Sequence, residues 1–358
     1  MRDLLVVGAG PGGLAAATAC ARAGLDVLVL EQRTLPADKA CGEGLMPAGV
    51  DALDALGALA RIPEADRAPF RAIRWIDEDG AAAEARLAAP GLGIRRVGLS
   101  AALAAAARAA GAEVREGVRV LSHRQLGDSV VVDTGAGEES ARVLAAADGL
   151  ASPIRAREGL AGAQVTARRF GIRRHFARAP WIDAVEVHFT DGAEAYVTPA
   201  GPGRVGVAFL YEEAARARHE ALLARFPRLG GRLEGAPADS AVAGAGPLAR
   251  GALARVRGRV VLVGDAAGYV DAITGEGLSL AFEAALSLSR VLPGALAPGR
   301  EEALAAYAHD AARRHHRYEA FARLTLSLAR RPDLRRAFIR EAARHPRAFA
   351  RLVGWAVA

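Results

Sequence analysis

Three glycines near the start of the chain have the spacing of a phosphate-binding turn. Gly8, Gly10 and Gly13 form the pattern G-x-G-x-x-G in the stretch VVGAGPGGLAA. In such a turn the first glycine allows a tight bend, the second lets a pyrophosphate approach the backbone, and the third lets a helix pack closely against a strand. Free N–H groups at the start of that helix attract negative charge. The pattern therefore predicts a site for the pyrophosphate of a dinucleotide.

The residues around these glycines predict the elements that position them. Residues 4–7 suit a buried parallel strand, residues 14–22 a helix that ends before Gly24, and residues 26–31 a second strand. Glu31 ends the second strand, where its carboxylate can accept hydrogen bonds from both ribose hydroxyls and repel a 2′-phosphate. This β-α-β unit is complete, but it fits FAD and NAD equally well.

Two further motifs place acids and glycines at strand ends. A strand in the run RVLAAADG ends at Asp148, and a strand at residues 260–263 is followed by Asp265. The sequence GEG at residues 275–277 then opens an alanine-rich helix. An acid at a strand end can bind a sugar-like hydroxyl or simply cap a turn, and a glycine-rich helix start can stabilise negative charge.

Together the three motifs, in this order and at about these distances, resemble the single-nucleotide-domain FAD oxidoreductases. That superfamily includes p-hydroxybenzoate-hydroxylase-type aromatic hydroxylases, geranylgeranyl reductases and flavin halogenases. The resemblance covers most of residues 1–300 and implies an α/β fold: a Rossmann-like FAD/NAD(P)-binding domain of the GR2 type with an inserted antiparallel β-sheet domain and C-terminal helices. The expected boundaries are 1–70, 96–165 and 251–300 for the FAD-binding domain, 71–95 and 166–250 for the substrate-binding sheet, and 301–358 for the helices.

The resemblance also implies which residues bind a non-covalent FAD. Asp265 would bind the ribityl or pyrophosphate part, residues 275–278 would face the pyrimidine end of the flavin, and Arg96 would open a helix and reach the cofactor. Arg96 and Glu31 could instead be exposed surface residues. The full expected set is Gly8, Gly10, Pro11, Gly12, Gly13, Glu31, Gln32, Lys39, Cys41, Gly42, Arg96, Val120, Asp148, Gly149, Asp265, Gly275, Gly277 and Leu278.

The segment KACGEGLMP contains Lys39, the only lysine among the 47 lysine and arginine residues. An ammonium group is a compact point charge and a guanidinium is a broad fork, so a tight glycine-lined crevice favours lysine. The segment resembles the K-x-C-G-E-type stretch that runs beneath the flavin in geranylgeranyl-reductase-like members. Cys41 could contact flavin or substrate, or fill a small buried space. Glu43 could equally be a structural acid.

The substrate side reads as antiparallel strands. Residues 184–211 alternate between apolar and polar around turns at 191–192 and 200–203, and residues 70–87 predict a hairpin that turns at 78–80. Tyr196, His175, His188 and Trp181 are candidates for the pocket, although for each of them we favour a role as an ordinary sheet residue. The catalytic candidates are Cys41 and Tyr196.

The aromatic signatures of two subfamilies do not match this chain. The geranylgeranyl reductases commonly carry Y-x-W-x-F-P on the sheet, and here AYVTP keeps only Tyr196 and Pro199. The W-x-W-x-I-P signature of flavin halogenases is absent from the sequence. Both departures weaken a direct assignment to either subfamily.

The net charge of the 358-residue chain is +7, and the excess of arginine favours coding bias over a nucleic-acid partner. Two cysteines make neither a disulfide framework nor a metal cluster. No apolar run reaches a spanning length, so we expect a cytoplasmic protein.

Residues 313–351 contain twelve arginines against three acids, with apolar residues at helical spacing. They predict either a basic surface that takes a lipid-like substrate from a membrane or, as we favour, a solvated helical cap on the FAD-binding domain.

The function expected from the resemblance is a flavin monooxygenase. NADH or NADPH would reduce FAD transiently, because no second glycine motif occurs, and molecular oxygen would form a flavin hydroperoxide that hydroxylates an aromatic, polyketide or lipid-like molecule. The first alternative is a geranylgeranyl-reductase-like saturase that reduces C=C bonds of an isoprenoid or polyketide. The second alternative is a non-catalytic flavin-binding protein. Oxygen dependence separates the first two.

Overall fold

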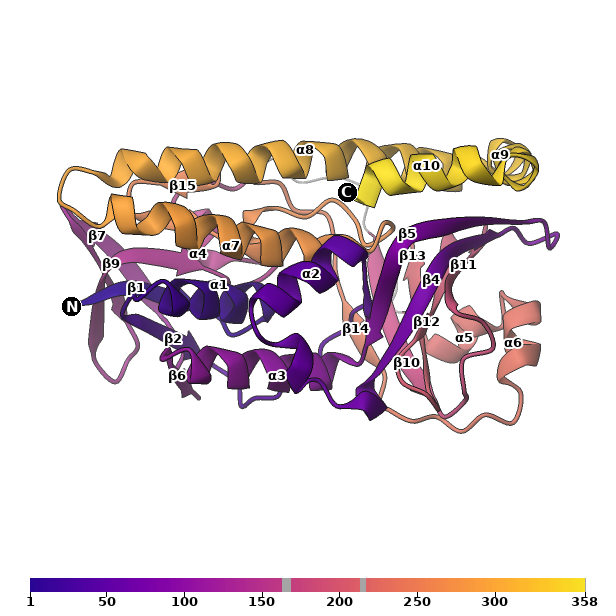
Figure 1. The fold of residues 1–358 in the computed structure, drawn as a ribbon, viewed down its shortest axis with the longest axis horizontal. Coiled ribbons are helices and arrows are strands. Elements are labelled where there is room, and N and C mark those ends of the chain that lie inside the picture. The colour runs from indigo at the N-terminus through magenta and orange to yellow at the C-terminus, as the bar shows by residue number, and fades with distance from the viewer. Residues whose placement is uncertain (163–168, 213–216, 358) are drawn as a thin grey trace.

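The computed structural model describes residues 1–162, 169–212 and 217–357, which form two sheets joined side by side under a layer of long helices (Figure 1). The first sheet has the order β15-β16-β9-β1-β2-β6, with β7 and β8 attached to β9. Its strands are β1 (Arg2–Val7), β2 (Val27–Glu31), β6 (Glu113–Glu116), β7 (Ser122–Leu126), β8 (Ser129–Asp133), β9 (Glu138–Ala146), β15 (Val256–Arg257) and β16 (Val260–Leu262).

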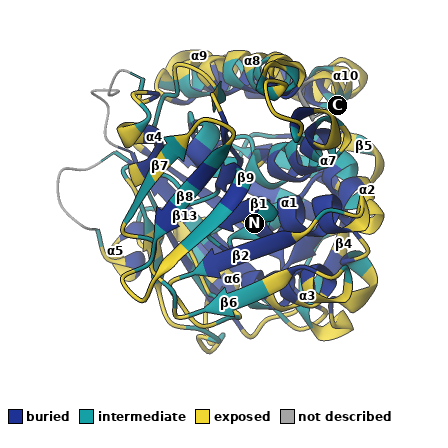
Figure 2. Ribbon diagram, turned by 90° about the vertical axis from the view of Figure 1, so that its left-hand side faces the viewer, coloured by how far each residue is buried: buried dark blue, intermediate teal, exposed yellow. Residues whose placement is uncertain are grey.

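The centre of this sheet is parallel, and β1 pairs with β2 on one side and with β9 on the other. Helix α1 (Pro11–Arg22) follows β1 and is buried from Gly12 to Ala21. Its neighbours are α3 (Arg96–Ala109) and α7 (Gly277–Ala295). Small side chains allow this helix to be enclosed on all sides, so β1, α1 and β2 lie at the buried centre of the molecule, mostly dark blue in Figure 2.

The second sheet has the order β14-β10-β13-β12-β11-β4-β5-β3. Its strands are β3 (Gly44–Leu45), β4 (Arg67–Ile76), β5 (Ala82–Ile94), β10 (Phe170–Phe176), β11 (Ala184–Thr190), β12 (Ala193–Pro199), β13 (Val205–Tyr211) and β14 (Ala243–Ala245). The predicted hairpins at 78–80, 191–192 and 200–203 are confirmed, because β4–β5, β11–β12 and β12–β13 pair antiparallel around them.

The sheet differs from the expected boundaries at its start. Strand β4 begins at Arg67, so the boundary expected at residue 71 falls inside it. Strand β3 also belongs to this sheet, since Gly44 pairs with Gly93 and Leu45 with Leu92. The segment that carries Cys41 therefore leads directly from the nucleotide-binding side into the second sheet. Short helices complete the fold: α2 (Pro47–Ala55), α4 (Pro153–Arg157), α5 (His219–Leu223) and α6 (Pro227–Leu233).

Three helices close the chain: α8 (Leu304–Ala329), α9 (Pro332–Arg344) and α10 (Pro346–Val357). Helix α8 packs along α7, as a cap on the first domain should, but α9 and α10 pack on β5 of the second sheet (Figure 1). Trp75 of β4 contacts the rings of Phe338 and Phe349 there. The expectation of a cap on the FAD-binding domain alone was too narrow, because the apolar stripes of α9 and α10 are buried on the sheet. Among the helices of the described residues, none is long and apolar enough to cross a membrane.

Candidate functional site

A cavity of about 250 Å³ lies where the two sheets meet. At one end it is bounded by residues 10–13, residues 39–44 and residues 263–265. At the other end it reaches the second sheet, where apolar side chains line it: Phe70, Ile73, Trp75, Val185, Val187, Leu210, Leu248, Phe321 and Val353. One continuous space thus joins the glycine-rich segments to an apolar chamber.

The glycine turn after β1 is packed on one side and open on the other. Gly8 has a φ of +103°, and a Cβ at Gly13 would lie 1.9 Å from the carbonyl oxygen of Gly8, so both positions require glycine. A Cβ at Gly10 would meet nothing within 4 Å. No side chain caps the start of α1. Its free N–H groups can therefore donate hydrogen bonds to a phosphate on the open side.

Most of the expected cofactor residues line the cavity and some do not. The lining includes Gly10, Pro11, Gly12, Gly13, Lys39, Cys41, Gly42, Arg96, Gly149, Asp265, Gly275, Gly277 and Leu278, together with Tyr196. Outside it lie Gly8, Glu31, Gln32, Val120 and Asp148.

Glu31 supports the glycine turn directly. Its Oε2 atom accepts a hydrogen bond of 2.6 Å from the N–H of Ala9, and its Oε1 atom accepts one of 2.9 Å from the N–H of Arg33. Carboxylate oxygens accept more than one hydrogen bond each. Glu31 is therefore anchored at the end of β2 and keeps acceptor capacity for ribose hydroxyls.

Asp148 acts as a cap in this structure. Its Oδ2 atom accepts a hydrogen bond of 3.2 Å from the N–H of Ile154 at the start of α4, and burial raises the pKa of its carboxyl. Nearby, the buried guanidinium of Arg155 donates to the carbonyl oxygens of Leu150 at 2.6 Å and Ala266 at 2.9 Å. Arg155 therefore ties the turn after β9 to the loop that carries Asp265.

Lys39 lies beside the turn after β9. A Cβ built on Gly149 would lie 3.5 Å from the Nζ atom of Lys39, so the ammonium rests against a residue without a side chain. Cys41 is partly exposed, and its sulfur accepts a hydrogen bond of 3.3 Å from the N–H of Glu43. The compact cation and the small thiol both line the glycine-rich end of the cavity.

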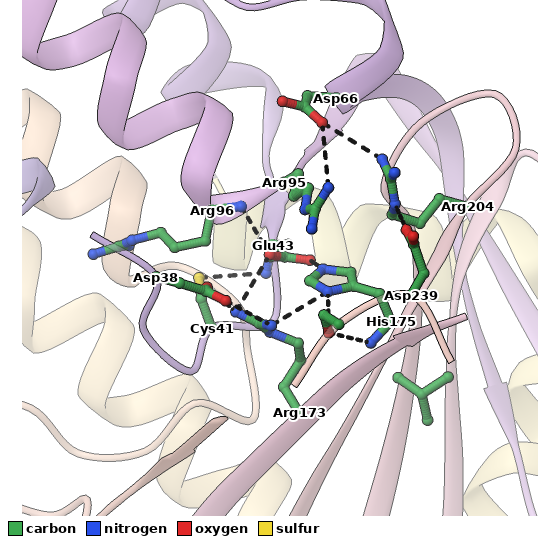
Figure 3. Close-up of polar contacts among 12 residues, drawn as sticks. Asp38, Cys41, Glu43, Asp66, Arg95, Arg96, Arg173, His175, Arg204 and Asp239 are labelled. Atoms are coloured by element: carbon green, nitrogen blue, oxygen red, sulfur yellow. Dashed lines mark hydrogen bonds and ion pairs between the residues drawn. The ribbon is translucent and has the colours of Figure 1, made fainter. Parts of the chain in front are cut away.

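Glu43 is the buried acid that sequence reasoning left undecided. Its carboxylate accepts a hydrogen bond of 2.8 Å from the N–H of Arg96 through Oε1, and its Oε2 atom lies 2.6 Å from Nε2 of His175 (Figure 3). The only local signal was an acid placed between two glycines. The partner His175 is 132 residues away in sequence, so no local pattern could identify it.

The aromatic and histidine candidates on the second sheet mostly point elsewhere. Tyr196 lines the cavity, but its hydroxyl donates a hydrogen bond of 2.9 Å to the carbonyl oxygen of Ile273, and burial raises its pKa well above the usual value. It is a fixed donor to the 270–276 loop. His188 and Trp181 lie outside the lining of the cavity, and both contact Glu186, in keeping with the structural role that the sequence favoured. His175 also lies outside the lining and meets Glu43 instead.

The 270–276 loop is held by a second buried group of charges. Arg169 lies 2.8 Å from Asp271 and 2.6 Å from Glu194, and the hydroxyl of Tyr318 donates to the backbone oxygen of Asp271. At the end of the loop, burial and the nearby charge of Glu283 raise the pKa of Glu276 to about 8.

The residues present fit a flavin dinucleotide. The start of α1 and the open face of Gly10 suit the pyrophosphate. A Cβ at Gly42 or at Gly275 would meet nothing within 4 Å, so two backbone segments that line the cavity can approach a flat ring system. Among the residues that the structure describes, none bonds to the buried Nε atom of Arg96, although this side chain lines the cavity. A buried donor of this kind calls for an acceptor, which the cofactor would supply.

Comparison with known proteins agrees with this assignment. The model of the family described as FAD binding domain matches residues 1–322. The chain is 30% identical over 308 residues to the menaquinone reductase of Mycobacterium tuberculosis, covering 78% of this chain and 74% of that protein. It is 30% identical over 294 residues to digeranylgeranylglycerophospholipid reductase 2 of Methanopyrus kandleri, covering 77% and 73%. It is 32% identical over 169 residues to the rifampicin monooxygenase of Streptomyces venezuelae, covering 45% and 34%.

A solved structure shows the same fold. The halogenase PltM in complex with phloroglucinol and FAD superposes with a TM-score of 0.75 at 18% identity, over 85% of this chain and 72% of that one. At this identity the likeness concerns the fold alone.

Proposed function

This chain belongs to the FAD-binding-domain family, and we propose that it is an FAD-dependent reductase that saturates C=C bonds of a long apolar molecule, an isoprenoid or a polyketide. The observation that carries the proposal is the continuity of the cavity. The glycine-rich end, where a flavin fits, opens into the apolar chamber without a break. The two relatives with broad coverage are both named as reductases, and one name specifies a digeranylgeranyl lipid.

The chamber offers a hydrocarbon surface. Ile73, Trp75 and Val187 line it from the second sheet, and Phe321 of α8 and Val353 of α10 line it from the helical layer. The hydroxyl of Tyr196 is already bonded to the backbone of Ile273, so this ring also presents mainly carbon. Burying each CH₂ group of a ligand contributes about 0.8 kcal/mol, which favours a long apolar chain over a small polar ring.

The proposed reaction adds a hydride, which FAD supplies when it is bound and reduced, to one carbon of the double bond and a proton to the other. NADH or NADPH would return the two electrons as a transient donor. The residues that line the cavity would bind the substrate, orient its double bond and exclude water.

The experiment that tests this reaction is anaerobic turnover. The FAD-loaded protein is reduced under argon and mixed with menaquinone or with a digeranylgeranylglycerophospholipid. We expect reoxidation of the flavin in the absence of oxygen and a product two mass units heavier per double bond, and with menaquinone this gain in mass must persist after the quinol is reoxidised in air. A flavin that stays reduced with both probes under argon would contradict the proposal.

A flavin monooxygenase is the second candidate. The sequence match to a rifampicin monooxygenase favours it, and a chamber with apolar walls would protect a flavin–oxygen adduct from water. Under air, this function predicts substrate-dependent oxygen consumption and a product that gains one oxygen atom. The same pair of measurements, with and without oxygen, therefore distinguishes the two candidates.

We also propose that the helical layer contacts an anionic membrane surface from which a lipid-like substrate is taken. Arg317 and Leu324 lie seven residues apart on α8, hence on one face, and Leu324 is exposed. Arg317 lies over the exposed ring of Trp355 on α10 and donates to its carbonyl oxygen at 2.9 Å. Arginine beside exposed Trp and Leu is the composition of interfacial helices.

A further inference from the structure

Glu43 adopts a backbone conformation that residues with side chains rarely adopt. Its φ is +63°, although glycine stands on both sides of it at positions 42 and 44. The left-handed conformation is unfavourable for a residue with a Cβ and is retained where the surroundings enforce it. Glycine would fit this backbone without strain. The side chain of Glu43 therefore has a use that outweighs the strain.

The carboxylate of Glu43 is fully engaged. Its side chain is 1% exposed, one oxygen accepts the N–H of Arg96, and the other lies 2.6 Å from His175. The guanidinium of Arg173 stands 3.8 Å away. The backbone oxygen of Glu43 accepts a further hydrogen bond of 2.8 Å from the N–H of Ile94. This residue is fixed from α3, from β5 and from β10 at once.

Strand β10 also holds the beginning of the same segment. Arg173 donates to the carboxylate of Asp38 (Figure 3). It also donates, at 3.2 Å, to the backbone oxygen of Lys39. Arg173 and His175 are two residues apart in the strand, so both side chains project from one face. The segment from Asp38 to Glu43, which includes Cys41 and lines the cavity from Lys39 onward, is thus attached to the second sheet at both ends.

We propose that Glu43 is a positioning residue. Together with Arg173, His175 and Asp38 it forms a clamp, called here the Glu43 clamp, that fixes the backbone at positions 41 and 42 against the flavin of bound FAD. Through the clamp, β10 of the second sheet supports that backbone. The proposal presupposes bound FAD, which the family implies, and is independent of whether the reaction is reduction or hydroxylation.

The chain contains a matched pair for comparison. Glu186 and His188 form a second buried carboxylate–imidazole contact, at 3.3 Å, in β11 of the same sheet. Neither residue lines the cavity. If buried Glu–His contacts only stabilised the sheet, removing the charge of either glutamate would change the same properties.

The test compares Glu43→Gln with Glu186→Gln in the FAD-loaded protein. The dissociation constant of FAD, the reduction potential of the flavin and its visible spectrum are measured beside the melting temperature. We expect Glu43→Gln to weaken FAD binding about tenfold and to shift the potential and the spectrum, because loss of one charged hydrogen bond has about this size. Glu186→Gln should change the melting temperature without altering the three flavin properties.

Two more variants keep the test decisive if Glu43→Gln does not fold. Glu43→Gly relieves the left-handed backbone but removes the carboxylate, and His175→Gln removes the imidazole while leaving Glu43 in place. We expect both to weaken FAD binding and to shift the flavin potential. Clamp variants that lower only the melting temperature, with FAD affinity and potential equal to those of Glu186→Gln, would overturn the proposal whatever the outcome of the turnover assay.

Discussion

Two buried groups of charges flank the cavity, and both use arginines from one stretch of chain. In the Arg169 cluster (Arg169, Glu194 and Asp271) the three side chains are 4%, 4% and 2% exposed, and Arg169 also lies 3.4 Å from the partly exposed Glu212. In the Glu43 clamp, Arg173 is buried but its partner Asp38 is 38% exposed. The first holds the 270–276 loop and the second holds the segment at Cys41. Both short ion pairs of Arg169 are therefore buried, whereas the closest ion pair of Arg173 reaches solvent.

This difference decides what each group contributes. Burial raises the pKa of Glu194 and of Asp271, whereas their attraction raises the pKa of Arg169. The arginine therefore stays charged, and the acids depend on it for compensation. Loss of one partner from a buried ion pair leaves an uncompensated buried charge. We expect the Arg169 cluster to govern stability and the clamp to govern the cofactor.

The largest effect should follow from Arg169→Met. It leaves two buried carboxyl groups without their cation, and we expect the free energy of unfolding to fall by about 3–5 kcal/mol. Chemical denaturation measures this loss. The control is Arg174→Ala, whose partner Glu220 is 66% exposed, and a change below about 1 kcal/mol is expected there. Equal losses for the two variants would remove the distinction between buried and exposed ion pairs.

The next effect concerns Glu276, at the end of the loop that the Arg169 cluster holds. The folded state raises its pKa to about 8 from 4.5, so it favours the protonated form. The resulting stabilisation is fully present below pH 4.5 and is lost as the pH rises through 8. Glu276→Gln cannot lose this proton and should be more stable than the natural chain at pH 9 by about 4–5 kcal/mol, with little difference at pH 4. If the free energy of unfolding depends on pH in the same way for Glu276→Gln and for the natural chain, the expected direction of this effect is wrong.

A smaller effect tests whether the two groups act separately. In a double-mutant cycle, Glu43→Gln and His175→Gln should couple by about 1–2 kcal/mol, since the two side chains are in contact. Glu43→Gln and Glu194→Gln share no partner and should be additive within about 0.5 kcal/mol. Strong coupling in the second cycle would mean that one network surrounds the cavity.

The smallest effect is expected on the outer surface, away from both groups. Arg317→Ala should weaken binding to phosphatidylglycerol vesicles by about 1 kcal/mol, which is the usual contribution of one basic residue near an anionic membrane. Sedimentation with vesicles at low and high salt measures this. Arg218→Ala, a change outside the helical layer, is the control and should leave binding unchanged. The membrane proposal fails if the natural chain does not distinguish phosphatidylglycerol from phosphatidylcholine.

The sequence alone predicted the parts of this protein that depend on local spacing. Gly8, Gly10 and Gly13 required a strand, a turn and a helix around them, and alternating residues predicted the hairpins of the second sheet. The family followed from three such motifs. These predictions held because turn geometry and side-chain alternation are set within a few residues.

Only the tertiary structure decided which distant side chains meet. It placed His175 on Glu43, Arg169 on Asp271 and the hydroxyl of Tyr196 on the backbone of Ile273. It also moved α9 and α10 from the expected cap to the face of the second sheet. Such contacts depend on how whole helices and strands pack together, and no local sequence pattern predicts that packing. The strained Glu43 was therefore visible in the sequence only as an acid between two glycines, and its role became clear once β10 stood beside it.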